Sequence, residues 1–194
     1  MKKLLIILLV LFYPIIKSNA EEKNINRMFV GNPDAKITII AYESLTCSYC
    51  ANFHKDVYPQ LKKDFLDTGL AKIEFRHFPL DLAAFNAAKI SQCRNDGETE
   101  IYNSLFANQQ KWIKGSSVEE ANKNLQKFLN DEGFNIEFEK CISDKQIEDF
   151  VLNDRIEGVK NYNVNATPTI IINNKKFEKS LNYKNLKKTL EKLI

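Results

Sequence analysis

Two cysteines separated by two residues, Cys47 and Cys50, lie at the junction between two kinds of hydrophobic pattern. The apolar run 37–42 before them predicts a buried strand. The segment 51–67 after them repeats apolar residues every four positions, which predicts a helix with one buried face. The start of a helix carries unpaired N–H groups and the positive end of the helix dipole, so it stabilises a thiolate at Cys47. The pair can therefore cycle between dithiol and disulfide, with Cys47 as the attacking sulfur.

The first 20 residues have the features of a secretory signal peptide. Lys2 and Lys3 precede an apolar stretch at 4–16, and residues 18–20 give a small-x-small cleavage pattern. The apolar stretch is shorter than the ~20 residues that span a bilayer, although an uncleaved anchor is the alternative. We therefore expect an exported, periplasmic protein, in a compartment where disulfides persist.

The charge of the chain argues against nucleic acid or an anionic membrane as a partner. The 194 residues carry a formal net charge of +3. Lys2, Lys3 and Lys17 account for this excess, and they lie in the predicted signal peptide, which contains no acidic residue. The mature chain is about neutral and lacks the basic excess that nucleic-acid binding needs.

The remaining sequence predicts an α/β fold that is interrupted by helices. Residues 71–78 alternate between apolar and polar and predict a second strand, which completes a βαβ unit with the strand at 37–42. Residues 81–160 show only helical periodicity. An apolar strand at 166–172 follows, and then an Asn-Asn turn, a short return strand and a closing helix at 182–194.

These features together resemble the thioredoxin fold, and the long helical block resembles the DsbA-like branch of exported thiol:disulfide oxidoreductases. The stretches SLTCSYCANFH (44–54) and FRHFPLD (75–81) also resemble that family, as does the late Thr167-Pro168. The likeness covers about residues 31–194. It implies a thioredoxin fold with an inserted α-helical domain, divided as follows: signal peptide 1–20, N-terminal half 21–80, helical insertion 81–160 and C-terminal half 161–194.

For the matching residues, the resemblance implies an active site. Cys47 would be the exposed nucleophile, and Cys50 would resolve the mixed disulfide. Pro168 would be a cis-proline whose loop packs beside the sulfurs. The backbone of Thr167 would pair with an extended substrate, as in strand addition. In the alternative reading, Pro168 merely begins a strand.

Three features leave the direction of electron transfer open. Many family members have an acid six residues before the first cysteine, where this chain has Ala41. Glu43, four residues before that cysteine, shares the strand face of position 41 and would either take part in proton transfer or be solvated at the strand end. The active-site dipeptide Ser48-Tyr49 has tyrosine at a position where isomerase and reductase relatives also have tyrosine. Before the proline this chain has Thr167, whereas strong oxidants of the family often have valine there. We expect a protein disulfide oxidoreductase, with the oxidase, isomerase and reductase directions all open.

The two other cysteines, Cys93 and Cys141, are expected to form a structural disulfide within the helical block. They lie in apolar periodic segments, beside Ile90 and Ile142, and an exported chain rarely keeps two free thiols close together. The alternative is two buried, unpaired cysteines that act as small apolar residues.

The resemblance also implies partners. Reduced or unfolded exported proteins would be the substrates, and a membrane redox protein would recycle the pair. No cofactor is expected. A monomer is expected, because the short segment before the first strand leaves no room for the dimerisation domain of the isomerases.

A different function for the same cysteines is a metallochaperone of thioredoxin fold that binds copper or another soft metal through Cys47 and Cys50. A structural zinc site is disfavoured because it usually needs a second closely spaced ligand pair. His54 is expected to be a surface or packing residue. Three aromatic side chains are expected in the core of the helical block, namely Tyr102, Phe106 and Trp112.

Overall fold

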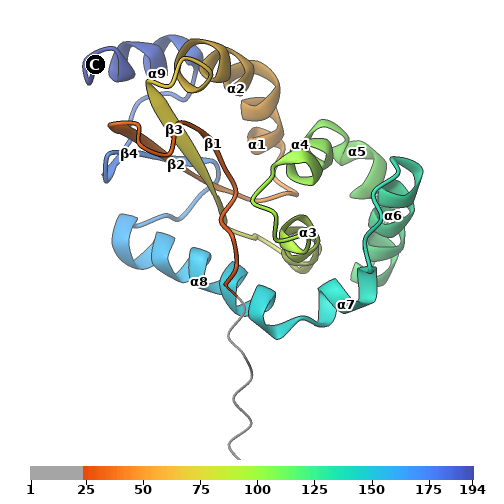
Figure 1. The fold of residues 1–194 in the computed structure, drawn as a ribbon. Helices are drawn as coiled ribbons and strands as arrows, with labels where there is room; N and C mark the ends of the chain where they lie inside the picture. Colours follow the sequence, from red (N-terminus) through yellow and green to blue (C-terminus); the bar gives the residue numbers. More distant parts are fainter. Residues whose placement is uncertain (1–23) are drawn as a thin grey trace, which may run out of the picture.

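The computed structural model describes residues 24–194 (Figure 1), so the predicted signal peptide lies outside the described residues. One mixed sheet runs through this part of the chain in the strand order β1-β3-β2-β4-β5. Across residues 24–194, no helix combines the length and the apolar character that a membrane span requires. The strands are β1 (Phe29–Gly31), β2 (Ile37–Glu43), β3 (Ala71–His77), β4 (Thr169–Ile172) and β5 (Lys175–Lys176).

The register of the sheet brings two distant segments together at one edge. β2 and β3 are parallel, with Glu43 opposite His77. β4 is antiparallel to β2, with Tyr42 opposite Thr169. The carboxyl end of β2 therefore lies beside the start of β4, and the loop after Glu43 meets the loop before Thr169.

The two faces of β2 pack into different clusters. Ile37, Ile39 and Ala41 join the main core, whereas Ile40 and Tyr42 join a smaller cluster on the opposite face. Figure 1 shows α2 and α9 on one side of the sheet and α8 on the other. Alternation along the strand thus places Glu43 on the face of the main core, with α1 and α2.

The helix after the cysteines is less regular than the sequence predicts. Instead of one helix over 51–67, the chain forms α1 (Ser48–Asn52) and α2 (Tyr58–Leu61), joined and followed by π-helical turns at Phe53–Val57 and Lys62–Leu66. Pro59 lies within α2 and has no N–H to donate, so the regular hydrogen-bond ladder cannot run through it. Phe53, Val57, Leu61 and Phe65 are nevertheless all buried in the core, as their spacing predicts.

Helices fill the chain between β3 and β4, which confirms the mixed α/β prediction. Trp112 and Tyr102 are buried, and Trp112 Nε1 donates a hydrogen bond to Leu105 O at 2.9 Å. Within the predicted helical stretch 81–160, residues 134–137 do not form a helix. The helices of this block are α3 (Leu82–Gln92), α4 (Glu100–Ala107), α5 (Gln109–Trp112), α6 (Val118–Asp131), α7 (Phe138–Ser143) and α8 (Lys145–Tyr162), and α9 (Tyr183–Leu190) packs on α2.

A disulfide joins Cys93, at the end of α3, to Cys141 in α7. Their Cα atoms are 5.6 Å apart, and the bridge spans 48 positions of sequence. On the chain-entropy model, a loop of that size restricts the unfolded chain enough to stabilise the fold by about 4 kcal/mol. The bridge therefore ties the end of α3 to α7 within the helical block.

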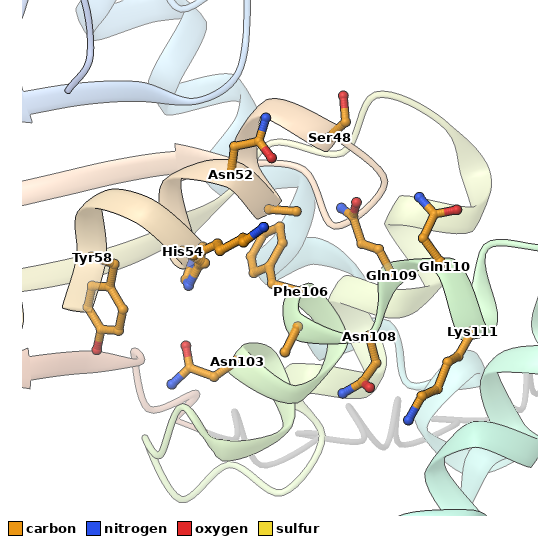
Figure 2. A pocket seen from close by; sticks show the side chains of 13 residues that line it. Ser48, Asn52, His54, Tyr58, Asn103, Phe106, Asn108, Gln109, Gln110 and Lys111 are labelled. Carbon is orange, nitrogen blue, oxygen red and sulfur yellow. The ribbon is translucent and has the colours of Figure 1, made fainter.

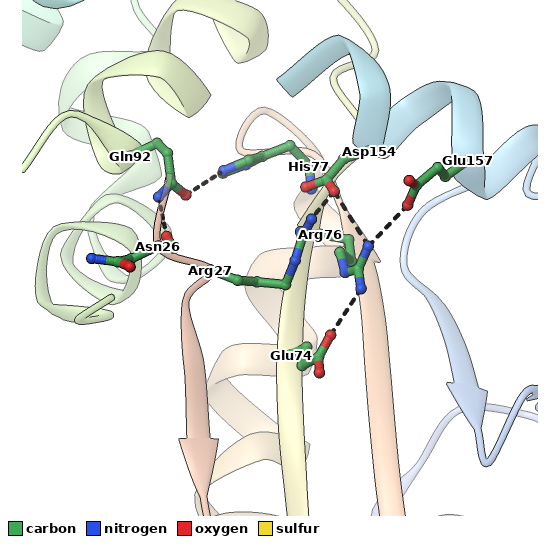
Figure 3. Close-up of polar contacts among 8 residues, drawn as sticks. All are labelled: Asn26, Arg27, Glu74, Arg76, His77, Gln92, Asp154 and Glu157. Atoms are coloured by element: carbon green, nitrogen blue, oxygen red, sulfur yellow. Dashed lines mark hydrogen bonds and ion pairs between the residues drawn. The ribbon is translucent and has the colours of Figure 1, made fainter. Parts of the chain in front are cut away.

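A buried carboxylate on α8 connects three parts of the chain (Figure 3). Asp154 Oδ1 accepts a hydrogen bond from Arg27 Nη1 at 2.7 Å, and Oδ2 accepts one from the backbone N–H of His77 at 3.0 Å. Arg76 Nη1 lies 3.6 Å from the same carboxylate and also binds Glu157, at 3.1 Å. Asp154 thus holds the segment before β1 and the end of β3 against α8.

Asp154→Ala is expected to lower the free energy of unfolding by about 3 kcal/mol, because it leaves two guanidinium groups without their buried counter-charge. Glu157→Ala removes an exposed carboxylate from the same Arg76 and is the matched control, expected to cost under about 1 kcal/mol. Denaturant unfolding of the three proteins measures both. Equal losses in the two variants would contradict a special role for the buried carboxylate.

Candidate active site

Cys47 is the N-terminal capping residue of α1. Its backbone is extended, and its Sγ accepts a hydrogen bond from the backbone N–H of Cys50 at 3.4 Å. In its protonated form, the thiol also donates a hydrogen bond to the carbonyl oxygen of Thr167, at 3.3 Å. The sulfur is therefore held between the first turn of α1 and the loop before β4.

The two sulfurs have opposite acidities. A hydrogen bond from the Cys50 side chain lowers the pKa of Cys47 to about 6, although partial burial opposes this shift. Complete burial raises the pKa of Cys50 far above the ordinary thiol value, and the hydrogen bond to Cys47 and the charge of Glu43 raise it further. Near neutral pH, Cys47 is a thiolate and Cys50 keeps its proton. This difference is what an attacking and a resolving sulfur require.

The loop before β4 completes one side of the site. The Thr167–Pro168 peptide bond is cis. Pro168 lies beside a cavity of about 440 Å³ next to the cysteines. Tyr49 of the dipeptide Ser48-Tyr49 is 73 % exposed at the rim of this cavity. Thr167 and Pro168 thus line the same cavity as Tyr49 of the dipeptide. The cavity is lined by Tyr49, Asn52, Phe53, Asp56, Val57, Thr167, Pro168, Leu181 and Asn182.

Gln109 positions the loop before the first cysteine, although nothing in its sequence context marks it. This buried side chain comes from α5 in the helical block, and its Nε2 donates hydrogen bonds to Leu45 O at 2.8 Å and to Cys47 O at 3.0 Å. No motif marks a lone glutamine that is 62 residues away from the cysteine it supports. The helical block thus contributes directly to the geometry of the active site.

A second tie fixes the other side of that loop. Thr46 Oγ1 donates a hydrogen bond to Asp81 Oδ2 at 2.8 Å, and Asp81 also caps α3. Leu80 and Leu82, on either side of Asp81, are exposed. Exposed apolar side chains therefore lie next to the residue that holds Thr46, which directly precedes Cys47.

Glu43 lies behind the sulfurs and is only 2 % exposed, so the expectation of a solvated strand-end residue is wrong. Its Oε2 is 2.9 Å from His54 Nε2 and accepts a hydrogen bond from Tyr102 O–H at 3.1 Å. His54 is likewise not a surface residue, because only 7 % of its side chain is exposed. The sequence left open whether His54 lies at the surface or packs in the interior, and its pairing with Glu43 is visible only in the fold.

Cys93 and Cys141 form their own bridge and are not part of this site. Among residues 24–194, no three His, Cys, Asp or Glu side chains converge in a way that could hold a metal ion. The arrangement at Cys47 and Cys50 is thus one of two sulfurs, a buried acid and a cis-proline loop.

Comparison with known proteins places this geometry among redox proteins. A family model described as Thioredoxin matches residues 23–192. A putative protein-disulfide oxidoreductase of Rickettsia conorii is 24 % identical over 152 residues, which cover 76 % of this chain and 53 % of that protein. Disulfide bond formation protein D of Bacillus subtilis is 27 % identical over 173 residues, which cover 84 % of this chain and 75 % of that protein. The chain thus spans little more than half the length of the rickettsial relatives.

Solved structures share the fold. Alpha-DsbA1 of Wolbachia pipientis superposes with a TM-score of 0.77 at 29 % identity, covering 87 % of this chain and 90 % of that one. BdbD of Bacillus subtilis, in its oxidised form, superposes with a TM-score of 0.70 at 24 % identity, covering 86 % of this chain and 92 % of that one. Together these matches confirm a thioredoxin fold that carries an inserted helical region.

The reduced protein is expected to show a thiolate absorbance step with a midpoint near pH 6. Cys50→Ala should move this midpoint upward, because it removes the hydrogen bond that lowers the pKa of Cys47 most. Cys47→Ser, the control, should lose the step altogether. A wild-type midpoint above about 8, close to the ordinary thiol, would contradict the capping geometry.

Proposed function

The chain belongs to the thioredoxin family, as a DsbA-like member, and from this premise we propose that it is an exported enzyme that exchanges disulfides with other proteins through Cys47 and Cys50. The observation that carries the proposal is the opposite acidity of the two sulfurs beside a cis-proline loop. A purely structural pair of cysteines needs no such difference. Family membership supports the fold and the general redox chemistry. The surroundings of Cys47 and Cys50 indicate which sulfur attacks and which one resolves.

Electron transfer proceeds in two exchanges. A substrate thiolate attacks Cys47 Sγ of the oxidised protein, the Cys47–Cys50 bond breaks, and Cys50 leaves and takes up a proton. A second substrate thiolate then attacks the substrate sulfur of this mixed disulfide, and Cys47 leaves as a thiolate. The substrate loses two electrons and gains a disulfide, while the Cys47–Cys50 pair gains those electrons. A low pKa makes Cys47 a good leaving group in the second step.

Glu43 is the group that would exchange the proton with Cys50. Its charge already acts on the Cys50 thiol, whose pKa it raises. A buried carboxylate beside a buried thiol can accept the proton when Cys50 must attack, and return it when Cys50 leaves.

The substrate would bind in extended form along the loop before β4. The carbonyl of Thr167 already points at Cys47 Sγ, at 3.3 Å, so a strand that pairs with this backbone would place its own sulfur near Cys47. The adjacent cavity beside Pro168 and Tyr49 offers space for neighbouring substrate side chains. Reduced or unfolded exported proteins fit this requirement.

Export, localisation and recycling complete the proposal. The apolar segment after Lys2 and Lys3 would direct the chain to the periplasm. A membrane redox protein would restore the disulfide, and the exposed side chains Tyr49, Leu80 and Leu82 offer it apolar contacts. The protein would work as a monomer and without a cofactor.

The alternative, a metallochaperone that uses Cys47 and Cys50, predicts a different outcome in an assay of disulfide exchange. Metal transfer needs no exchange with dithiols, whereas an oxidoreductase exchanges disulfides without any metal. Within the described residues 24–194, the two cysteines also lack a third ligand-type neighbour in a metal-binding arrangement.

Cys47→Ser is expected to abolish disulfide exchange with a reduced model protein in metal-free buffer, because it removes the attacking sulfur. Cys50→Ser should instead trap mixed disulfides at Cys47, because the resolving sulfur is missing. Gel separation without reductant and mass spectrometry distinguish the two results. Retained exchange in Cys47→Ser, or no exchange by the wild type, would contradict the proposed function.

The second disulfide provides an internal control in this experiment. Mild reductant should free Cys47 and Cys50 first and leave Cys93 bonded to Cys141. Alkylation followed by mass mapping measures the order. Simultaneous release of both pairs would contradict a structural role for Cys93 and Cys141.

The reduction potential is expected to change its dependence on pH near pH 6. Below the Cys47 pKa, reduction of the disulfide consumes two protons, so the potential should fall by about 59 mV per pH unit. Above it, only Cys50 takes a proton, and the slope should drop to about 30 mV per unit. Redox titration against glutathione measures this, and a steep slope that persists to pH 8 would contradict the asymmetry of the sulfurs.

The same titration gives the direction of electron transfer. A potential near ~−120 mV would indicate an oxidant, and one near ~−270 mV would indicate a reductase.

A further inference from the structure

Glu43 and His54 form a buried acid–imidazole pair between the resolving cysteine and a cavity on the far side of α1. Glu43 Oε2 is held by His54 Nε2 at 2.9 Å and by Tyr102 O–H at 3.1 Å. Its other oxygen, Oε1, is buried without a hydrogen-bond partner among residues 24–194. An unpartnered buried carboxylate oxygen costs free energy and calls for an explanation. Proton exchange between Glu43 and Cys50 would explain this unpartnered oxygen. The proton must then also have a route from Glu43 to solvent.

Most titratable groups around Glu43 cannot pass that proton on. Burial raises the pKa of Tyr58 to about 12 and that of Tyr102 well above its usual value, so both phenols keep their protons. On β3, burial lowers the pKa of His77, whose Nε2 faces Gln92 at 3.4 Å within the core. Cys50, the proton donor itself, is fully buried.

His54 differs from these groups because it also lines a cavity of about 680 Å³ between α1–α2 and α4–α5. Figure 2 shows its ring between Tyr58 and Phe106, with Asn103 on the other side of the cavity. The ring stacks on Phe106, with centroids 4.2 Å apart and planes 17° apart. Nε2 contacts Glu43, so Nδ1 is the nitrogen that can exchange a proton with water in the cavity.

The lining of the cavity suits water and proton release. Asn103, Asn108 and Gln109 contribute polar groups, which can hold water molecules in a space of this size. Lys55 and Lys111 also line the cavity, and the Lys111 ammonium group pairs with Glu132 at 3.3 Å. A proton at His54 Nδ1 can therefore pass to water in the cavity.

We propose that His54 relays protons between Glu43 and the water-accessible cavity during each cycle of the Cys47–Cys50 pair. When Cys50 resolves a mixed disulfide, its thiol proton moves to Glu43, and its sulfur forms the bond to Cys47 as the substrate thiolate leaves. Glu43 then gives its proton to His54 Nε2, while Nδ1 releases one to the cavity. In the oxidising direction the same steps run backwards and supply the proton that the departing Cys50 needs. This inference rests on the proposed function.

The test is a single turnover of the reduced protein with oxidised glutathione, quenched with acid and read by mass spectrometry. Formation of the Cys47–glutathione mixed disulfide requires Cys47 alone, and its decay reports the attack by Cys50. His54→Ala is expected to slow this decay about 100-fold, the lower end of what a positioned proton-transfer group contributes. Tyr102→Phe is the matched control, because it removes the other hydrogen bond to the same Glu43 oxygen, and it should slow the decay far less.

Chemical rescue separates a relay from a structural support. Imidazole added to His54→Ala can enter the cavity and should restore the decay in proportion to its concentration and its basic fraction as pH is varied. Pyrazole has nearly the same size and shape but is a much weaker base, so it should not. If His54→Ala does not fold, His54→Gln keeps a donor to Glu43 but has no second ring nitrogen, and it should show the same slow decay.

Two results would overturn the relay alone. One is decay in His54→Ala at the rate of Tyr102→Phe, and the other is equal rescue by pyrazole and imidazole. If the wild type forms no mixed disulfide with glutathione at all, the proposed function fails, and the relay fails with it. Mixed disulfide that forms normally but decays slowly only without His54 supports both.

Discussion

The hydrogen bonds that Cys47 Sγ receives from Cys50 make the two sulfurs of the pair different, and the rest of the site depends on that difference. The backbone N–H of Cys50 points at Cys47 because α1 begins there. The same helical turn places Cys50 in the main core, where it is completely buried. One short helical turn therefore lowers one thiol pKa and raises the other. Neither effect needs a distant charge, although Glu43 adds to the second.

That turn is kept in place by parts of the chain that are far apart in sequence. β2 ends in Glu43, and the sheet register brings the Thr167–Pro168 loop beside it. Gln109 binds the carbonyls of Leu45 and Cys47 from the opposite side. A loop carrying a reactive sulfur would otherwise be among the least ordered parts of a domain. Here it is fixed by the sheet on one side and by the helical block on the other.

The sequence predicted the parts of the site whose signal is local. Three features could be predicted: a strand before Cys47, a helix after Cys50, and a Thr-Pro before the last strand. Each has a local signal, because hydrophobic periodicity and the conformational limits of proline act over a few residues. The π-helical turns at Phe53–Val57 and Lys62–Leu66 were not predictable, since the apolar spacing is nearly the same in both geometries. Burial of Glu43 and His54 was missed for a different reason. A lone acid or histidine shows its partner only once the fold brings the two together.

In this chain the helical block builds the rear of the active site. Tyr102 binds Glu43, Phe106 orients the ring of His54, and Gln109 holds the loop of Cys47. All three come from α4 and α5, which the sequence shows only as helical periodicity. Residues in this block can therefore change the proton chemistry of the cysteines without touching either sulfur. Divergence within the helical insertion, and not only in the two residues between the cysteines, is then a route by which such a fold adjusts its redox chemistry.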